Sequence, residues 1–390
     1  MSAEPSAAEA LRRWLAALAD GGWVAPGEVE RVPVAAAAGR VLAAGLRAVR
    51  PVPALAVAAM DGIAVRAADT AGAPVRLATG AFASVDTGAP LPAGFDAVVR
   101  RERVRADGAD VEVAEAVEPG ADVRPAGEDV PPDVEVAAAG RELTPFDVGL
   151  LAASGHAEVA VRRRPAVAVI PTGDELRSPG EDAGPEHVVD SNCPMLAAQA
   201  AADGAVATIH PRVPDDPRRL EEEVMRAVLQ NDLVLLVAGS SRGRRDHSRD
   251  VLARLGAVAV DGVAVRPGHP VLLAVVGATP VIGVPGYPVS AAFTYELFAH
   301  PLLCALTDRP AERQEVPVVL DGDVGGRDDA ECMVAVRLAA GPEHRLHAAP
   351  LSRRAAAVRS LAEADAYVVV PPGPGAATGD VVTARLLRTR

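Results

Sequence analysis

The stretch Ala166-Val-Ala-Val-Ile-Pro-Thr-Gly-Asp-Glu-Leu176 organises the rest of the chain. Its first five residues are apolar and mostly β-branched, with no polar alternation, which predicts a strand buried on both faces. Pro171-Thr-Gly173 then interrupts the strand, and two acids, Asp174 and Glu175, follow. Ligands of open α/β sheets bind outside the carboxyl ends of the strands. We therefore expect the loop after this strand to take part in the chemistry of the protein.

Strand and helix patterns alternate from this stretch onward. Further strands are predicted at 206–209, 233–237 and 281–284, of which 233–237 is buried, and helices are predicted at 195–202, 217–229, 251–255 and 290–303. A strand followed by a helix and another strand is the pattern of a parallel sheet, so we predict a doubly wound α/β domain.

The segments on either side of the α/β region have other patterns of apolar and polar residues. Residues 5–20, 34–48 and 145–153 have helical patterns, whereas residues 51–128 are short alternating runs between Gly and Pro turns, typical of a mainly β domain. Four β-like runs after residue 310 predict a small barrel or sandwich. The predicted domains are a helical linking and dimerisation region (1–50 and 129–164), an inserted mainly-β domain (51–128), the α/β domain (165–310) and a C-terminal β-barrel (311–390).

Composition excludes several functional classes. The net charge of −13 argues against a general nucleic-acid binder, which needs a basic surface. All 39 basic residues are Arg, which excludes a Walker-type phosphate loop and a Schiff-base lysine. No apolar run reaches about 18 residues, and there is no secretory signal pattern, so we expect no membrane span. Three cysteines without CxxC spacing favour a reducing cytoplasm and exclude a cysteine-built zinc site.

Polar residues collect after the predicted strands of the α/β domain. Small and glycine-rich loops at helix starts offer N–H groups to anions, Arg side chains bind oxyanions, and carboxylates suit Mg²⁺. The candidates for binding are Thr172, Gly173, Asp190, Gly239, Ser240, Ser241, Arg266, His269, Pro285, Pro288 and Ser290, and the carboxylates that could hold metal are Asp174, Glu175, Asp190 and Asp246.

Each of these residues also has a simpler interpretation. Asp190 and Asp246 stand where a helix cap is expected, Gly239 could form a tight turn, and a lone His269 is usually a surface residue. The convergence of four such loops on one sheet edge favours a site instead. The residues alone predict an α/β enzyme for an anionic, phosphorylated ligand with a divalent metal.

A larger set of motifs extends this prediction. Met60-Asp-Gly-Ile-Ala, Thr87-Gly-Ala-Pro-Leu-Pro, Arg124-Pro-Ala-Gly-Glu-Asp129, Thr172-Gly-Asp-Glu-Leu176, Asp190-Ser-Asn192 and Pro285-Gly-Tyr-Pro-Val-Ser290 occur in this order. The set resembles the MoeA family, the molybdopterin molybdenumtransferases, also found as the E domain of gephyrin. The resemblance covers nearly the whole chain. It implies a MogA-like α/β domain and a homodimer, with a cleft between the β domain of one subunit and the α/β domain of the other.

The resemblance also implies a reaction. Adenylylated molybdopterin is hydrolysed with Mg²⁺, molybdenum from molybdate is placed on the dithiolene, and AMP is released. A MogA-type adenylyltransferase and apo-molybdoenzymes are the implied partners, with no nucleic acid or membrane. The motifs carry over Asp61, Glu175 and Asp246 as catalytic residues, and Thr87, Arg124 and Asp129 as binding residues.

Three loops depart from the family pattern. Ala238-Gly-Ser-Ser-Arg-Gly243 replaces Ser-Gly-Gly-Val-Ser-x-Gly, Arg266-Pro-Gly-His-Pro270 replaces Lys-Pro-Gly-Lys-Pro, and Pro285-Gly-Tyr-Pro288 replaces Pro-Gly-Asn-Pro. These departures indicate a divergent member with a retuned oxyanion or pterin site. They keep three alternatives open: a non-catalytic molybdopterin-binding or scaffold relative, a tungstate-using variant, and a pterin-nucleotide hydrolase that inserts no metal.

Overall fold

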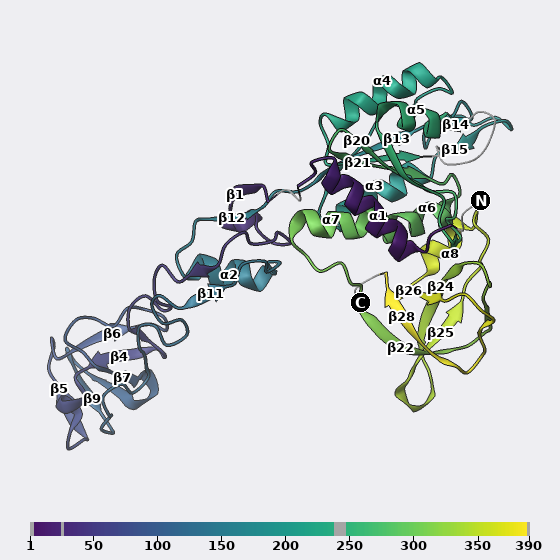
Figure 1. Ribbon diagram of the computed structural model, residues 1–390. Helices are drawn as coiled ribbons and strands as arrows, with labels where there is room; N and C mark the ends of the chain where they lie inside the picture. Colours follow the sequence, from purple (N-terminus) through teal and green to yellow (C-terminus); the bar gives the residue numbers. More distant parts are fainter. Residues whose placement is uncertain (1–3, 25–26, 238–246, 388–390) are drawn as a thin grey trace. The chain divides into compact units, whose positions relative to one another are not determined.

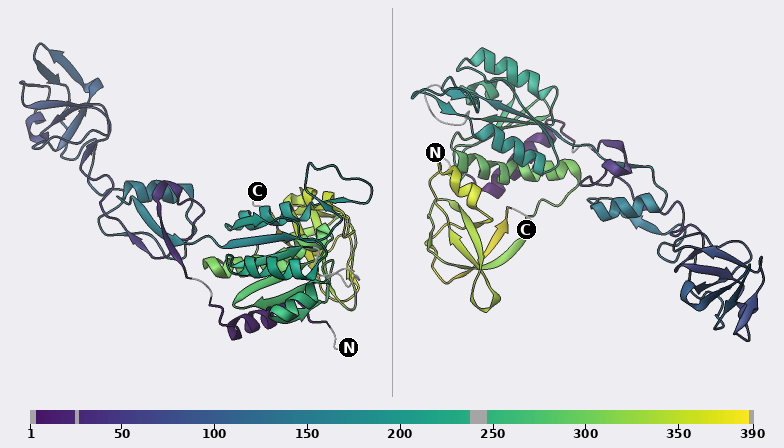
Figure 2. Two further views of the ribbon diagram at one scale, coloured as in Figure 1. Left: turned by 90° about the horizontal axis from the view of Figure 1, so that it is seen from above. Right: turned by 180° about the vertical axis from the view of Figure 1, so that it is seen from behind.

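The computed structural model describes residues 4–24, 27–237 and 247–387, and the chain divides into two compact units (Figures 1 and 2). The main unit comprises Met1–Glu28 and Arg163–Arg390, and the inserted unit comprises Val29–Arg162. The α/β sheet and the C-terminal barrel lie in the main unit.

A six-stranded sheet forms the centre of the main unit, in the order β16-β13-β17-β21-β20-β18. The two last strands, β20 (Leu272–Val276) and β18 (Ala257–Asp261), were not predicted. Strand β20 is antiparallel to both of its neighbours, β21 and β18, so the expectation of an all-parallel sheet is wrong at this edge. A two-residue connection, Gly277-Ala278, joins β20 to β21 as a hairpin, which requires opposite strand directions. The four predicted strands are parallel: β16 (Val206–Ile209), β13 (Ala166–Pro171), β17 (Leu233–Val237) and β21 (Thr279–Val284).

Helices cover both faces of this sheet (Figure 1), which explains why its strands show no polar alternation. Val167 and Val169 of β13 pack in one apolar cluster with α1, α3 and the helix that follows β21. Ala168 and Ile170 pack in a second cluster with α4 and α5. These helices are α1 (Ala7–Asp20), α3 (Asn192–Ala202), α4 (Pro217–Val228) and α5 (Ser248–Leu255), at the predicted positions.

Helix α1 packs on the sheet through Trp14. This side chain is fully buried, and its indole Nε1–H donates a hydrogen bond to the carbonyl oxygen of Ala274 in β20 at 2.8 Å. Residues 1–28 fall within the predicted linking region, whereas the structure includes α1 in the main unit.

A continuous helical stretch follows β21 from Pro288 to Thr307. It consists of α6 (Pro288–Thr294), a π-helical turn (Tyr295–Ala299) and α7 (His300–Thr307). Among the described residues this is the one helix whose length and composition would suffice to cross a membrane, but 83% of its apolar window is buried inside the protein. Such burial is typical of a core helix.

The linking part of the inserted unit contains short strands and one α-helix. Strand β1 (Val29–Pro33) pairs with β12 (Glu158–Arg162), and β2 (Leu46–Arg47) pairs with β11 (Glu135–Ala137). The predicted helix α2 (Pro145–Ala153) is confirmed, and a reciprocal capping box between Thr144 and Asp147 fixes its start.

The helix predicted over Val34–Ala48 is wrong. Only the 3₁₀ turn Val34–Ala36 forms. Gly39 then takes φ +73°, a left-handed conformation that ends any helix, and Val41 and Leu42 form bridges to neighbouring strands. The apolar spacing in this segment serves strand pairing instead.

The rest of the inserted unit is a β domain, as predicted. Three-stranded sheets form in the orders β6-β4-β7 and β5-β9-β8, and β10 pairs with β3. Their bounds are β3 (Val57–Ala58), β4 (Gly62–Val65), β5 (Val75–Leu77), β6 (Phe82–Val85), β7 (Ala97–Arg100), β8 (Val104–Asp107), β9 (Asp110–Val113) and β10 (Val123–Arg124).

A closed five-stranded barrel follows the α/β domain and confirms the prediction of a small barrel. Its strand order is β24-β25-β22-β28-β26, and β26 pairs again with β24. One strand, β25, was not predicted, because Leu346-His-Ala-Ala-Pro350 lacks β-branched residues. The strands are β22 (Glu315–Leu320), β24 (Glu331–Ala340), β25 (Leu346–Pro350), β26 (Ala366–Val370) and β28 (Val381–Leu386).

The three cysteines are free thiols, and each is buried in a different element. Cys193 lies in α3, Cys304 in α7 and Cys332 in the barrel strand β24.

Candidate functional site

A pocket of about 840 Å³ lies at the carboxyl ends of the parallel strands β13, β17 and β21. Loops that were predicted to converge there form its walls, together with Ala355 and Ala356 from the segment before α8 (Val358–Glu363). The predicted site residues that line this pocket are Glu175, Asp190, Arg266, His269, Pro285, Pro288 and Ser290.

Glu175 contributes an exposed carboxylate to the pocket. Its neighbour Asp174 lies 3.4 Å from Nη1 of Arg212 as an ion pair, whereas no described residue forms a hydrogen bond or ion pair with the side chain of Glu175. The Glu175 carboxylate rests against the backbone of Gly173, where a Cβ atom would meet its oxygens at 2.8 Å. Glu175 is thus the acid of this pair that is available to a ligand.

Asp190 combines a structural role with a place in the pocket. Its Oδ1 accepts hydrogen bonds from the backbone N–H groups of Asn192 and Cys193, both at 3.0 Å, and so caps the start of α3. Oδ2 takes no part in this cap. The adjacent Asn192 donates from Nδ2 to the carbonyl oxygen of Gly286 at 2.8 Å, while its buried Oδ1 has no partner among the described residues. That oxygen is an acceptor for a ligand or water.

Arg266 and His269 are the residues able to carry positive charge among those described as lining the pocket. Both approach one carboxylate, that of Glu4: His269 Nδ1 lies 3.1 Å from Oε1, and Arg266 Nη1 lies 4.0 Å from Oε2. Strand β19 (Val265–Arg266) pairs with β24 of the barrel, which fixes the loop that carries both cations.

The loop before α6 offers fewer backbone donors than its sequence suggests. Pro288 has no N–H, and the N–H of Val289 donates to the carbonyl oxygen of Ala355 at 2.9 Å. Ser290 is buried at the pocket wall, and the Tyr287 side chain is 62% exposed at its mouth. This loop therefore supplies shape and an aromatic ring more than N–H donors for an anion.

Thr172 and Gly173 do not line the pocket. The buried hydroxyl of Thr172 donates to the carbonyl oxygen of Val237 at 2.9 Å and ties the end of β13 to the end of β17. Their predicted role in direct binding becomes one of support for the Glu175 loop. The predicted residues Gly239, Ser240, Ser241 and Asp246 lie outside the described residues.

The pocket residues fit a magnesium ion in donor type. Glu175 and Asp190 place hard carboxylate oxygens on one cavity, and Mg²⁺ in enzymes is commonly held by one or two carboxylates plus substrate phosphates. Within the described ranges, no three His, Cys, Asp or Glu side chains converge on a metal site. Substrate oxygens would have to complete the coordination of an ion at Glu175 and Asp190.

A second group of predicted residues comes together in the inserted unit. Ala58 N–H donates to Ala89 O and Ala59 N–H to Asp122 O, so hydrogen bonds join the segments that carry Asp61, Thr87 and Arg124. Oδ1 of Asp61 accepts two hydrogen bonds from Thr87, from its N at 2.7 Å and its Oγ1 at 2.8 Å. These bonds hold the pKa of Asp61 below its usual range.

Arg124 and Asp129 are both exposed in this group. Arg124 Nε donates to Glu128 Oε2 at 2.5 Å, and the side chain of Asp129 has no partner among the described residues. The inserted unit thus presents an ionised Asp61, an Arg124 with further donors, and an unpaired Asp129.

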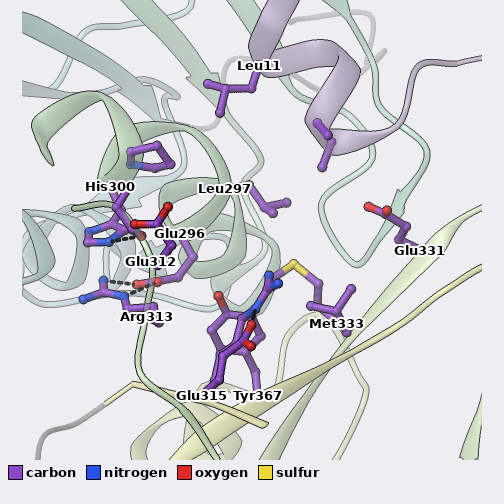
Figure 3. Close-up of a pocket in the computed structure, with 16 residues that line it drawn as sticks. Leu11, Glu296, Leu297, His300, Glu312, Arg313, Glu315, Glu331, Met333 and Tyr367 are labelled. Atoms are coloured by element: carbon purple, nitrogen blue, oxygen red, sulfur yellow. Dashed lines mark hydrogen bonds and ion pairs between the residues drawn. The ribbon is translucent and has the colours of Figure 1, made fainter. Parts of the chain in front are cut away.

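A second cavity, of about 440 Å³, lies where α1, the continuous helical stretch Pro288–Thr307 and the barrel meet (Figure 3). Leu11, Leu297 and Met333 project toward it from these three elements, and none of the sequence-predicted site residues lines it. Arg313 forms two hydrogen bonds with Glu296, each 2.9 Å, and so fixes the chain before the barrel to the helix. We interpret this cavity as a structural junction.

A buried ionic network lies beside this junction. Oδ2 of Asp203 accepts from Tyr295 OH at 2.7 Å and pairs with His300 Nδ1 at 2.8 Å, and His300 Nε2 lies 3.1 Å from the carbonyl oxygen of Ala311. Both ring nitrogens of His300 therefore face acceptors, as in an imidazolium. Burial lowers the pKa of His300, but the hydrogen bonds to Asp203 and Cys304 outweigh it and raise the pKa to about 9.

Several pocket residues were not predicted. Glu4 reaches Arg266 and His269 from the N-terminal segment, and Ala355 and Ala356 come from the connection between the barrel strands β25 and β26, without any local motif. Val188 and Val189, exposed at 57% and 45%, form an apolar part of the wall. The two consecutive valines directly before the Asp190 motif were the one sequence signal that could have identified this apolar wall.

Three family models match successive parts of the chain. The model of the MoeA N-terminal region (domain I and II) matches residues 5–155, that of a probable molybdopterin binding domain matches residues 168–305, and that of the MoeA C-terminal region (domain IV) matches residues 328–387.

Curated relatives and solved structures agree with these matches. A molybdopterin molybdenumtransferase of Synechococcus elongatus is 32% identical over 376 residues, covering 89% of this chain and 92% of the relative. Molybdopterin molybdenumtransferase 2 of Mycobacterium tuberculosis is 34% identical over 298 residues, covering 70% and 74%. A crystal structure of the molybdopterin biosynthesis MoeA protein from Pyrococcus horikoshii superposes with a TM-score of 0.82 at 28% identity and covers 100% of both chains.

Proposed function

This chain belongs to the MoeA family of molybdopterin molybdenumtransferases and takes part in molybdenum cofactor biosynthesis, and from that premise we propose that its α/β pocket binds the substrates of molybdenum insertion. The proposed reaction uses adenylylated molybdopterin and molybdate, hydrolyses the adenylate, places molybdenum on the dithiolene and releases AMP. One observation carries the proposal: a free carboxylate, an arginine, a histidine and an amide oxygen without a described partner line a single pocket at the carboxyl ends of the sheet.

Each pocket residue has a role that its chemistry supports. The unpartnered carboxylate of Glu175 is suited to orient and deprotonate the water that attacks the phosphoanhydride. Arg266 and His269 are suited to hold anionic oxygens of phosphate or molybdate, because both can donate charge-assisted hydrogen bonds. Asn192 Oδ1 accepts a hydrogen bond from an N–H group of the substrate.

Glu175 and Asp190 are the described residues that would hold Mg²⁺. When bound, the ion would neutralise the charge of the phosphoanhydride oxygens. The cap that Asp190 forms on α3 keeps its carboxylate at the pocket wall whether or not an ion is present.

The inserted unit supplies the second set of proposed substrate contacts, through Asp61, Thr87, Arg124 and Asp129. We propose that the protein acts as a homodimer in the cytoplasm, with the β domain of one subunit and the α/β domain of the other forming the substrate cleft. A MogA-type adenylyltransferase would deliver the adenylylated substrate, and apo-molybdoenzymes would receive the product. Family membership supports these proposals.

The direct test is incubation with adenylylated molybdopterin, Mg²⁺ and molybdate, with AMP release and metal content of the product as readouts. AMP release together with molybdenum in the product is the expected result. AMP release without metal identifies a hydrolase, and an absence of AMP release above background refutes the proposed enzyme. The same assay with tungstate determines which oxyanion is preferred.

A further inference from the structure

Glu4 faces the Arg266 and His269 side chains of the pocket, although it lies far from both of them in the sequence. Its Oε1 lies 3.1 Å from His269 Nδ1, and its Oε2 lies 4.0 Å from Arg266 Nη1. The Nδ1 atom of His269 is shielded from solvent and has no aligned hydrogen-bond acceptor. Glu4 therefore approaches His269 closely without an aligned hydrogen bond between them.

The fold positions Glu4 through the residues that follow it. The carbonyl oxygen of Pro5 accepts a hydrogen bond from the N–H of Ala264 at 2.8 Å. Ser6 caps α1 by accepting from the N–H of Glu9, and Trp14 fixes the same helix to β20. Glu4 thus occupies a defined place between an anchored helix and the loop that carries Arg266.

The charge of Glu4 counters that of the pocket cations. Arg266 and His269 are the positively ionisable side chains among the described lining residues, so one nearby carboxylate cancels much of their attraction for an anion. Glu4 itself is 30% exposed, which leaves its charge partly screened and its effect moderate.

We propose that Glu4 is an internal counter-anion that sets the affinity of the pocket for oxyanions. It lowers the affinity of Arg266 and His269 for a tetrahedral oxyanion or a substrate phosphate, and so determines how readily an anionic group exchanges there. The inference rests on the proposed function only in requiring that an oxyanion binds at these two side chains.

The test is direct binding of molybdate, and separately of inorganic phosphate, to the full chain by equilibrium dialysis at low ionic strength. Glu4→Gln keeps the size of the side chain and removes its charge, so it should tighten binding by about two- to fivefold. Glu9→Gln on α1 is the matched control, since Glu9 pairs with Arg12 and Arg13 outside the pocket, and it should leave binding unchanged.

Repeating the Glu4→Gln substitution in two further variants shows whether its effect on anion binding acts through Arg266 and His269. In a His269→Lys background, where position 269 carries a permanent positive charge, Glu4→Gln should again tighten binding. In an Arg266→Ala/His269→Ala background its effect should vanish. Equal or weaker binding by Glu4→Gln, a gain that persists without the two cations, or no anion binding by any of these proteins would each overturn the proposal. Turnover of adenylylated molybdopterin is measured separately. If Glu4→Gln tightens anion binding but the protein shows no turnover, the proposed function is rejected and the role of Glu4 stands.

Discussion

Thr87 donates twice to the same oxygen of Asp61, from its backbone N at 2.7 Å and from its hydroxyl at 2.8 Å. The backbone bond is the larger cause of the lowered pKa of Asp61, and the hydroxyl bond adds to it. Among the described residues, the ion-pair partner of Asp61 Oδ2 is Arg101, at 3.8 Å. Asp61 is therefore ionised across the physiological range and presents one oxygen to a ligand.

Replacing Thr87 by Val should raise the pKa of Asp61 toward its ordinary value, because the hydroxyl donor is lost while the backbone donor remains. Since a lowered pKa keeps Asp61 charged in acid, the acidic limb of the pH–activity profile should move to higher pH. Carboxyl NMR titration measures the shift directly. Thr79→Val is the control, because Thr79 bonds to Asp110 in the same domain. An equal shift of the Asp61 pKa in the Thr87→Val and Thr79→Val variants would contradict the assignment of Thr87 as the partner that lowers this pKa.

Glu175→Gln should reduce AMP release by about 10²–10⁴-fold, the usual contribution of a general base. Its stability should change by less than about 0.5 kcal/mol, because the side chain is exposed and has no described partner. Asp174→Asn, a neighbouring substitution at an acid that pairs with Arg212, serves as the control and should keep most of the activity. Comparable losses in both variants would remove the distinction between the two acids.

Asp190→Asn separates the cap from the metal site. Asn caps helices about as well as Asp, so the thermal stability should be retained, whereas Asp190→Ala should lose about 1 kcal/mol. If Asp190 holds Mg²⁺, both variants should need a higher Mg²⁺ concentration for half-maximal activity. An unchanged Mg²⁺ dependence would leave Asp190 as a cap alone.

His300 should make stability depend on pH in the alkaline range. Its pKa is raised to about 9 in the folded protein, from about 6.5 in the unfolded chain. The stabilisation is therefore fully present below about pH 6.5 and is lost as the pH rises through about 9. Thermal unfolding at pH 6 should show His300→Gln destabilised by on the order of 2–3 kcal/mol, and the difference should shrink by pH 9.5. A constant difference at both pH values would exclude a charged His300.

Arg313→Met should destabilise the protein by about 3 kcal/mol, because it leaves the buried Glu296 without its partner. The double variant Arg313→Met/Glu296→Gln should recover part of this loss, since no unpaired charge remains. Denaturant unfolding of the single and double variants gives the coupling between the two residues. A double variant as unstable as the sum of the singles would show that the pair is not coupled.

The centre of the fold was predictable because its strands are unbroken apolar runs. The run Ala166–Ile170 and the strand Leu233–Val237 lie where expected, since burial on both faces leaves few other structures open to them. The antiparallel edge was not predictable in the same way. Its hairpin signal, Gly277-Ala278, lies between two apolar stretches that continue the same pattern. At residues 34–48, helical spacing was present, and Gly39 and strand pairing overrode it.

The pocket was predictable to the extent that it follows from strand direction. Loops after the parallel strands β13 and β21 meet at one edge, which brings Glu175 and Pro285 together without any motif. Arg266 reaches the same pocket from β19, which pairs with the barrel strand β24, so strand direction in the α/β sheet does not explain its place. The contact of Glu4 with His269 was not predictable, because it joins two residues far apart in the sequence through the docking of α1. The motif match already favours Glu175 over Asp174 as the site residue; the ion pair of Asp174 with Arg212 is what no local pattern supplies.

The buried thiols give the protein three internal reporters of local opening. Cys193 lies directly behind the Asp190 cap, Cys304 beside His300, and Cys332 in the barrel strand that pairs with β19. Burial raises the pKa of the Cys193 thiol, so an alkylating reagent meets little thiolate in the closed structure. The modification rate of each cysteine therefore measures how often its own element opens, and substrates that tighten the pocket would slow Cys193 selectively.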